Sequence, residues 1–166
     1  MKVKVKVPAT SANLGPGFDV AGLALTLYNT FTFELADQGL NITGCPEQFC
    51  NEENMTYQAF KQAAEICGLE YQGVNIECSG DVPYTRGLGS SSTCIVAGIV
   101  GAFAFKDKVE DRQEILELAT AIEGHPDNVA PAIYGGLTAS LVEADKPYSV
   151  RYPINEQACF CVLIPN

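Results

Sequence analysis

The sequence predicts a mixed fold in which strands and helices follow no regular β-α alternation. Three observations carry this prediction. Residues 1–7, MKVKVKV, alternate charge and valine, which is typical of a half-exposed strand. Helical spacing of apolar residues begins only after further strand-like runs, and the chain closes on strand patterns in succession. At 166 residues, the chain suits one domain.

The elements follow in order. We expect strands at residues 2–7 and 22–35, with residues 40–43 pairing back onto the second. A helix at 56–67 is indicated by apolar spacing, and Gly68 is a typical end signal. A strand at 74–78, an apolar helix at 94–105 and an amphipathic helix at 110–122 come next. Residues 124–128 are typical of a turn, and strands are expected at 135–143, 148–152 and 159–164.

Charge and composition exclude several classes of protein. Ten basic and twenty acidic residues give a net charge of −10, which argues against binding to a nucleic-acid backbone. No apolar run approaches the roughly 20 residues that span a bilayer, and the start lacks a signal-peptide pattern. We therefore expect a cytoplasmic protein with no membrane partner. The seven cysteines contain no Cys-x-x-Cys pair, which favours free thiols over a zinc or iron–sulfur site.

The most informative segment is residues 80–93, GDVPYTRGLGSSST, between a predicted strand and a predicted helix. Free N–H groups and the helix dipole favour an anion at such a helix start. Gly87 and Gly89 allow a phosphate to approach the backbone closely, and the serine hydroxyls add donors and a magnesium ligand. The segment lacks the lysine of a Walker A loop, the third glycine of a dinucleotide fingerprint and the last glycine of a nucleophile elbow. From this loop alone, a serine-capped helix after a glycine turn is an equal alternative.

Two further segments extend the pattern. Residues 8–22, PATSANLGPGFDVAG, carry an amide and a carboxylate in a glycine-containing turn, and residues 123–136, EGHPDNVAPAIYGG, crowd a carboxylate, an imidazole and an amide. In this order, the three segments closely resemble the GHMP kinase family. The glycine loop is similar to the family's Pro-x-x-x-Gly-Leu-Gly-Ser-Ser phosphate motif, and the other two segments are similar to its homoserine branch. The matching residues run from Pro8 to Gly136.

This resemblance implies an α+β fold with a mixed sheet and packed helices, related to a domain of a small-subunit ribosomal protein. It also implies ATP-dependent phosphorylation of the side-chain hydroxyl of L-homoserine, on the route to threonine. ATP and Mg²⁺ are the implied cofactors, and a homodimer is left open.

The resemblance also assigns roles to residues. The ATP phosphates would be wrapped by the loop residues Pro83, Tyr84, Thr85, Arg86, Gly87, Leu88, Gly89, Ser90, Ser91, Ser92 and Thr93, with Leu88 packing beneath. Asn54 would lie near the adenine, although it is equally suited to cap the helix at 56–67. Mg²⁺ would be held by Ser90 and Glu123, with Ser91 and Glu117 as the alternatives; one carboxylate with phosphate oxygens and water suffices for this ion.

Homoserine would be bound by Asn13, Asp19 and His125, where Asp19 supplies an anion for the ammonium group. At the position where mevalonate-type relatives place a catalytic aspartate, this sequence has Asn128. An amide is no general base at neutral pH, so Asn128 would act by aligning the reacting groups and stabilising charge.

The alternatives to homoserine phosphorylation are a mevalonate- or shikimate-type kinase of the same family, a non-catalytic binding module with this fold, and a serine hydrolase using Ser91 and His125. The last lacks the elbow pattern. Homoserine kinases are longer than this chain. We therefore expect residues 1–166 to be an N-terminal, ATP-binding portion that phosphorylates homoserine poorly or not at all by itself.

Overall fold

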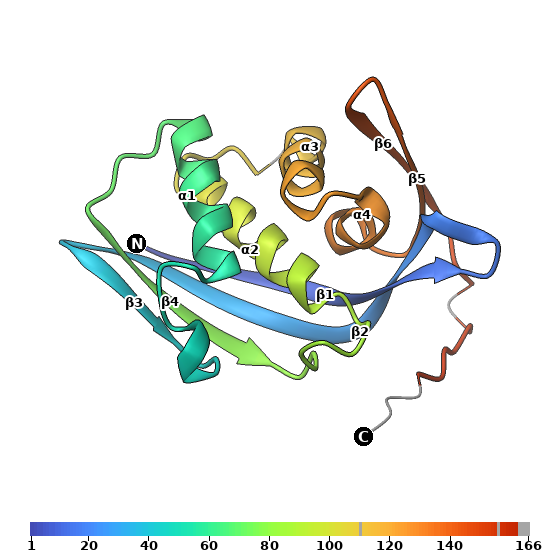
Figure 1. Cartoon of the computed structure of the whole chain (residues 1–166), viewed down its shortest axis with the longest axis horizontal. Helices are drawn as coiled ribbons and strands as arrows, with labels where there is room; N and C mark the ends of the chain where they lie inside the picture. The colour runs from blue at the N-terminus through green and yellow to red at the C-terminus, as the bar shows by residue number, and fades with distance from the viewer. Residues whose placement is uncertain (110, 156, 163–166) are drawn as a thin grey trace.

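The computed structural model describes residues 1–109, 111–155 and 157–162, and within them a six-stranded sheet carries its helices on one face (Figure 1). The elements in chain order are β1 (Lys2–Leu14), β2 (Gly17–Ala36), β3 (Gly39–Thr43), the 3-10 turn η1 (Glu47–Phe49), α1 (Met55–Cys67), β4 (Gly73–Gly80), α2 (Ser90–Ala104), α3 (Arg112–Glu123), α4 (Pro126–Tyr134), β5 (Leu137–Glu143) and β6 (Lys146–Tyr152). The expected α+β fold with a mixed sheet is confirmed.

The long strand β2 organises the sheet. It pairs antiparallel with β1 along one edge, while its other edge pairs with β5 near its start and with β4 near its end. The strand order is β3-β4-β2-β5-β6, with β1 beside β2. In β1, the valines of the opening pattern are buried and the lysines are exposed, as the alternation predicts.

The core lies between the sheet and the helices. Phe33 of β2 stacks on Phe60 of α1 with ring centroids 5.5 Å apart. Two glycines let α2 approach closely: a Cβ on Gly98 would lie 2.3 Å from the Thr56 carbonyl oxygen of α1, and one on Gly101 would meet the Phe33 ring at 2.7 Å. This close packing positions the first turn of α2 at the end of the sheet.

The structure corrects several sequence-based boundaries. β3 pairs in parallel with β4 instead of folding back onto β2, because α1 carries the chain over the sheet between them. α2 begins at Ser90, four residues before the apolar pattern, because a helix can begin on polar residues. Residues 126–134 form α4, which was missed because Pro126 and Pro131 resemble turn signals; Pro126 occupies a position where a helix start tolerates proline.

The predicted strand at 159–164 is wrong over its described part. Residues 159–162 are in no strand and are exposed, since no neighbouring strand pairs with them among the described residues. Residues 163 and 164 of that prediction lie outside the described ranges.

Candidate functional site

The glycine loop between β4 and α2 is held down at two points and exposed between them. Val82 and Leu88 are buried with Ala9 of β1 in a small apolar cluster. The expectation that Leu88 packs beneath the loop is therefore confirmed. Residues 84–87 lie between these anchors and are exposed. The anchors fix the loop while its middle faces outward.

A buried amide on β2 joins the loop to the first turn of α2. The Asn29 side chain accepts a hydrogen bond from the Val82 N–H at 3.2 Å and donates to the Thr93 hydroxyl at 3.1 Å. Thr93 in turn donates to the Ser90 carbonyl oxygen at 2.8 Å. Both ends of the loop are thus tied to one side chain in the sheet.

The start of α2 has the free donors that the sequence predicted. Thr93 is the first residue of this helix whose N–H bonds back along the chain, to the Gly89 carbonyl oxygen at 2.9 Å. In the described part of the chain, the N–H groups of residues 87–92 have no acceptor. Unpaired N–H groups and the helix dipole are the features that favour an anion at a helix start.

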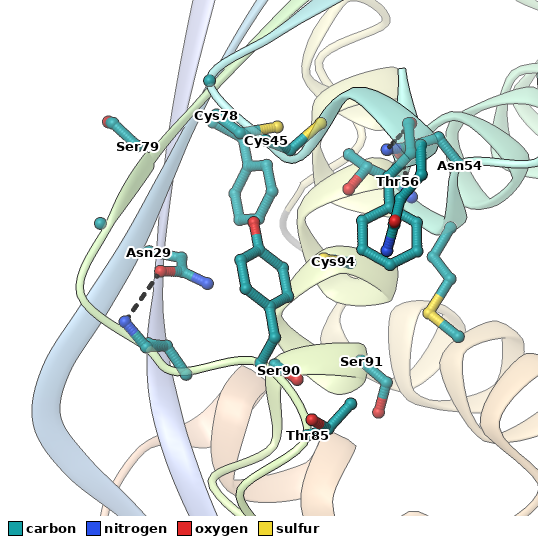
Figure 2. Close-up of a pocket in the computed structure, with 18 of the residues that line it drawn as sticks. Asn29, Cys45, Asn54, Thr56, Cys78, Ser79, Thr85, Ser90, Ser91 and Cys94 are labelled. Atoms are coloured by element: carbon teal, nitrogen blue, oxygen red, sulfur yellow. Dashed lines mark hydrogen bonds between the residues drawn. The ribbon is translucent and has the colours of Figure 1, made fainter. Parts of the chain in front are cut away.

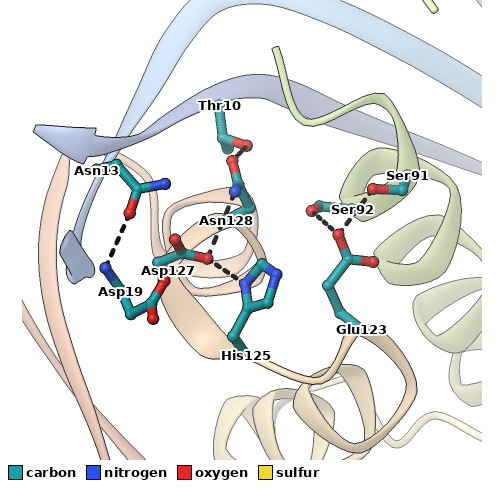
Figure 3. Close-up of polar contacts among 9 residues, drawn as sticks. All are labelled: Thr10, Asn13, Asp19, Ser91, Ser92, Glu123, His125, Asp127 and Asn128. Atoms are coloured by element: carbon teal, nitrogen blue, oxygen red, sulfur yellow. Dashed lines mark hydrogen bonds and ion pairs between the residues drawn. The ribbon is translucent and has the colours of Figure 1, made fainter. Parts of the chain in front are cut away.

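A carboxylate from α3 reaches this helix start. Glu123 Oε1 accepts hydrogen bonds from Ser91 Oγ at 2.7 Å and from Ser92 Oγ at 3.1 Å (Figure 3). Glu123 is the last residue of α3, and Gly124 ends that helix with φ of 96°. Glu117, the alternative carboxylate, is exposed and accepts instead from Gln113 Nε2 at 3.1 Å. The structure therefore brings Glu123, but not Glu117, to the serines.

Thr10 of β1 connects the loop to α4. Its N–H donates to the Leu88 carbonyl oxygen at 3.1 Å, and its hydroxyl donates to Asn128 Oδ1 at 2.8 Å. Its side chain fully occupies the space beside Gly89, where an added Cβ would lie 2.0 Å from Thr10 Oγ1. Gly89 is also left-handed, with φ of 66°. Thr10 therefore fixes Asn128 relative to the start of α2.

The start of α4 carries the remaining polar groups. His125 occupies the N-cap position of this helix without a side-chain capping bond and is half-exposed, and its Nδ1 is hydrogen-bonded to Oδ1 of the buried Asp127. Pro131 has no N–H to bond the Asp127 carbonyl oxygen. Gly22 of β2 packs against that oxygen, which a Cβ would approach to 1.9 Å. Proline and glycine thus let α4 lie directly on β2.

The tip of the β1–β2 hairpin presents Asn13 and Asp19. Both adopt left-handed backbone angles, with φ of 59° and 54°, which their short polar side chains tolerate. Asn13 Oδ1 accepts a hydrogen bond from the Asp19 N–H at 2.9 Å. The Asp19 carboxylate is exposed. Because Ala12 pairs with Gly22, which contacts Asp127, the tip lies next to the start of α4 (Figure 3).

A cavity of about 510 Å³ adjoins the other side of the glycine loop. Its walls come from β2, β4, η1, the start of α1, the loop residues 84 and 85 and the first residues of α2 (Figure 2). Three thiols lie on the wall. Burial raises the pKa of Cys45 to about 11 and that of Cys78 to about 12, and it also raises the pKa of Cys94, so these thiols are uncharged at neutral pH. The Tyr84 ring lies 6.2 Å from that of Phe49.

Asn54 lies on this cavity wall but uses its side chain within the protein. Its Oδ1 accepts from the N–H groups of Thr56 and Tyr57, and its Nδ2 donates to the Phe49 carbonyl oxygen at 2.8 Å. The capping interpretation of Asn54 is confirmed, and a contact with adenine stays a prediction.

Sequence reasoning placed the right segments together but missed three side chains. Thr10, Asn29 and Asp127 had no assigned role, yet each is buried and hydrogen-bonded at the site. Thr10 and Asp127 lie inside the segments already singled out, so their position was a signal. Asn29 lies in an apolar strand, and the only sequence signal for its role was that a single amide stands among apolar residues.

Two properties of the described residues bear on partners. No described helix is long and apolar enough to cross a membrane. Across residues 1–109, 111–155 and 157–162, no cluster of three or more His, Cys, Asp or Glu side chains is arranged to hold a metal ion. A cation at Glu123 would therefore need oxygen ligands from a bound molecule and from water.

Comparisons with known proteins agree with this geometry. The family described as GHMP kinases N terminal domain matches residues 54–136. A curated homoserine kinase of Clostridium beijerinckii is 48% identical over 99% of this chain and 55% of its own length. The crystal structure of a homoserine kinase from Cytophaga hutchinsonii is similar over 93% of this chain and 52% of that one, with a TM-score of 0.77 and 30% identity. A mevalonate kinase from Methanococcus jannaschii shares the fold, with a TM-score of 0.70 at 17% identity over 92% of this chain and 56% of its own.

The chain spans about half the length of the curated relatives it matches. The family match covers the glycine loop, Glu123 and the start of α4, where the polar groups converge. This chain belongs to the GHMP kinase family.

Proposed function

We propose that this chain is the ATP-binding portion of a kinase that phosphorylates the side-chain hydroxyl of L-homoserine. The observation that best supports this proposal is the meeting of several polar groups at the start of α2. Open N–H groups, two serine hydroxyls and the Glu123 carboxylate lie together there, next to a cavity of about 510 Å³. The names and identities of the relatives support the choice of homoserine.

In this proposal, the two sides of the glycine loop have different roles. The open amides of the loop and of α2 bind the phosphates of ATP, and the thiol-lined cavity receives the adenosine. Asn13, Asp19 and His125 bind homoserine on the opposite side, where the hairpin tip meets α4. A hydroxyl held there would lie beside the loop, because Thr10 joins Asn128 to the loop backbone.

The residues present fit a magnesium ion. Hard Mg²⁺ prefers oxygen ligands and takes one or two carboxylates together with phosphate oxygens and water. Glu123 supplies the carboxylate, and Ser91 Oγ lies 2.7 Å from it, so we place Ser91 ahead of Ser90 as the hydroxyl ligand. When bound, the ion would neutralise charge on the phosphates.

Asn128 is proposed to orient the substrate hydroxyl rather than to remove its proton. Its Oδ1 is held by Thr10, and its Nδ2 lies 3.4 Å from Asp127 Oδ1, which fixes the amide plane. Phosphoryl transfer can proceed through positioning and charge stabilisation without a strong base. Losing one such preorganised group typically costs about 3 kcal/mol in the barrier.

Calorimetry with Mg-ATP tests the nucleotide site in the 166-residue chain. We expect binding that is lost on adding a chelator and weakened about tenfold or more by Glu123→Gln, since an interaction with a charged group contributes roughly 1.5–3 kcal/mol. Glu117→Gln is the matched control, because that carboxylate lies on the same helix and bonds only Gln113 among the described residues. Equal loss in both variants, or no magnesium-dependent heat at all, would refute the assignment.

Phosphotransfer is best measured in a version extended to the length of the relatives. With homoserine, mevalonate and shikimate offered in parallel, we expect turnover of homoserine alone. Asn128→Ala should lower kcat by roughly a hundredfold if that amide aligns the reacting groups. A change within a factor of about two would remove Asn128 from this role. The unextended chain should turn over homoserine poorly.

A further inference from the structure

Two thiols flank the turn η1, and one of them, Cys45, lines the cavity. The sulfur atoms of Cys45 and Cys50 lie 3.5 Å apart. Cys50 Sγ also lies 3.7 Å from the carbonyl oxygens of Cys45 and of Pro46, so its side chain folds back over the turn toward Cys45. The Phe49 and Cys50 N–H groups bond the carbonyl oxygens of Pro46 and Glu47, which keeps the turn tight.

We propose that Cys45 and Cys50 form a reversible oxidation site, at which a small-molecule disulfide converts the two thiols into a disulfide that closes this turn. A disulfide bond is about 2.05 Å long, so the sulfurs need to approach by roughly 1.5 Å, which side-chain rotation and a small backbone shift can supply. The site needs no ligand in the neighbouring cavity.

Exposure determines which thiol reacts first. Cys50 is exposed and meets the oxidant, whereas Cys45 is half-buried behind it. The other thiols around the cavity, Cys78 and Cys94, are less accessible, and burial keeps them protonated. Since the thiolate is the nucleophile, these two thiols compete poorly for the oxidant. Burial raises the pKa of Cys45 as well, so Cys45 reacts only in the second step, where its 3.5 Å contact with Cys50 Sγ selects it.

The reaction proceeds in two exchanges. The Cys50 thiolate attacks one sulfur of the small disulfide, whose S–S bond breaks, and one small thiolate leaves. Cys45 then gives its proton to solvent and attacks Cys50 Sγ, which expels the second small thiolate. Two protein thiols are oxidised, and one small disulfide is reduced to two thiols. A reducing dithiol reverses both steps.

The Cys45–Cys50 disulfide would affect the glycine loop through one side chain, Phe49. Phe49 lies between the two cysteines in the sequence, and its ring packs 6.2 Å from that of Tyr84. Both rings lie on the cavity wall. A disulfide across the turn therefore fixes the part of the wall that faces the loop.

The test uses a background in which Cys159 and Cys161, the exposed thiols of the C-terminal segment, are changed to serine. Incubation with glutathione disulfide at about pH 8, where an exposed thiol is partly ionised, should remove two titratable thiols. Peptide mapping should find Cys45 joined to Cys50, and dithiothreitol should restore both thiols. Because Cys50 is exposed, Cys50→Ser should fold normally, and it should abolish the internal disulfide. Cys94→Ser should leave it intact.

Three outcomes would overturn the proposal. The first is a mapped link from Cys45 to Cys78 or Cys94 in place of Cys50. The second is an internal disulfide that still forms in the Cys50→Ser variant. The third is a folded protein in which Cys45 and Cys50 form no disulfide with each other and stay free or carry only one glutathione. This outcome counts once glutathione disulfide has acted for long enough to oxidise a dithiol peptide of residues 45–50.

Discussion

Replacing Thr10 with valine tests whether one hydroxyl joins the glycine loop to α4. Thr10 is fully buried, and its Oγ1 donates to Asn128 Oδ1 at 2.8 Å. Valine keeps the shape and removes the donor. A buried hydrogen bond contributes about 1 kcal/mol net, and leaving its acceptor unpaired costs about 1–3 kcal/mol. Because Asn128 is only half-buried and water can reach it, we expect a loss of roughly 1–2 kcal/mol in the free energy of unfolding.

Urea denaturation followed by circular dichroism measures this loss. Thr120→Val is the matched control, because Thr120 Oγ1 is buried without a hydrogen-bond partner among the described residues. Removing an unpaired hydroxyl should leave the free energy of unfolding unchanged or raise it. If both variants lose equally, or if Thr10→Val unfolds like the parent protein, the bond between Thr10 and Asn128 does not hold this part of the site.

Three further predictions concern the helix contacts and the thiols. Gly98→Ala should destabilise the fold by roughly 1–3 kcal/mol in thermal unfolding, because its methyl group would lie 2.3 Å from a carbonyl oxygen of α1; an unchanged melting temperature would contradict the close crossing. Asn54→Ala should cost at least about 1 kcal/mol through loss of the α1 cap, and Asn54→Asp should restore only part of it in the same assay, because a carboxylate keeps the capping oxygen but cannot donate to the Phe49 carbonyl oxygen. Burial raises the pKa of Cys78 from 9.0 to about 12, so the unfolded chain loses this proton first as pH rises. The free energy of unfolding should therefore keep its full value below about pH 9 and decrease above it. In Cys78→Ser, this decrease with rising pH should be smaller.

The elements and the site were predictable to different extents from the sequence. Strand alternation in β1 and the end of α1 at Gly68 are local signals, and they located the start of β1 and the end of α1 correctly. They did not show that β1 continues from residue 7 to Leu14, because the polar residues there and the glycines that follow are also typical of a turn. α4 could not be found in this way, because Pro126 and Pro131 carry the same local signal in a turn and in a helix. The partner of β3 depends on where α1 returns the chain, which no local pattern encodes.

The same distinction applies to the site. The resemblance paired Ser90, or Ser91 as its alternative, with Glu123, and the hydrogen-bond donors to Glu123 in the structure are Ser91 and Ser92. The sequence did not indicate Thr10 or Asn29, because a buried threonine and a lone amide in a strand are ordinary until their partners in space are known. Those partners lie 118 and 64 residues away along the chain.

The contact of two hydroxyls with one carboxylate oxygen has a consequence for the order of assembly. With Ser91 and Ser92 both donating to Glu123 Oε1, the negative charge is already solvated by the protein, and the pocket keeps its shape without any ion. A divalent cation that arrives by itself has to break at least one of these hydrogen bonds and gains only a single new ligand, the carboxylate oxygen. This exchange is unfavourable in water, where the cation is already hydrated. In the proposed function, a cation that arrives already chelated by a polyphosphate brings most of its coordination shell along, so metal and nucleotide should enter as one species.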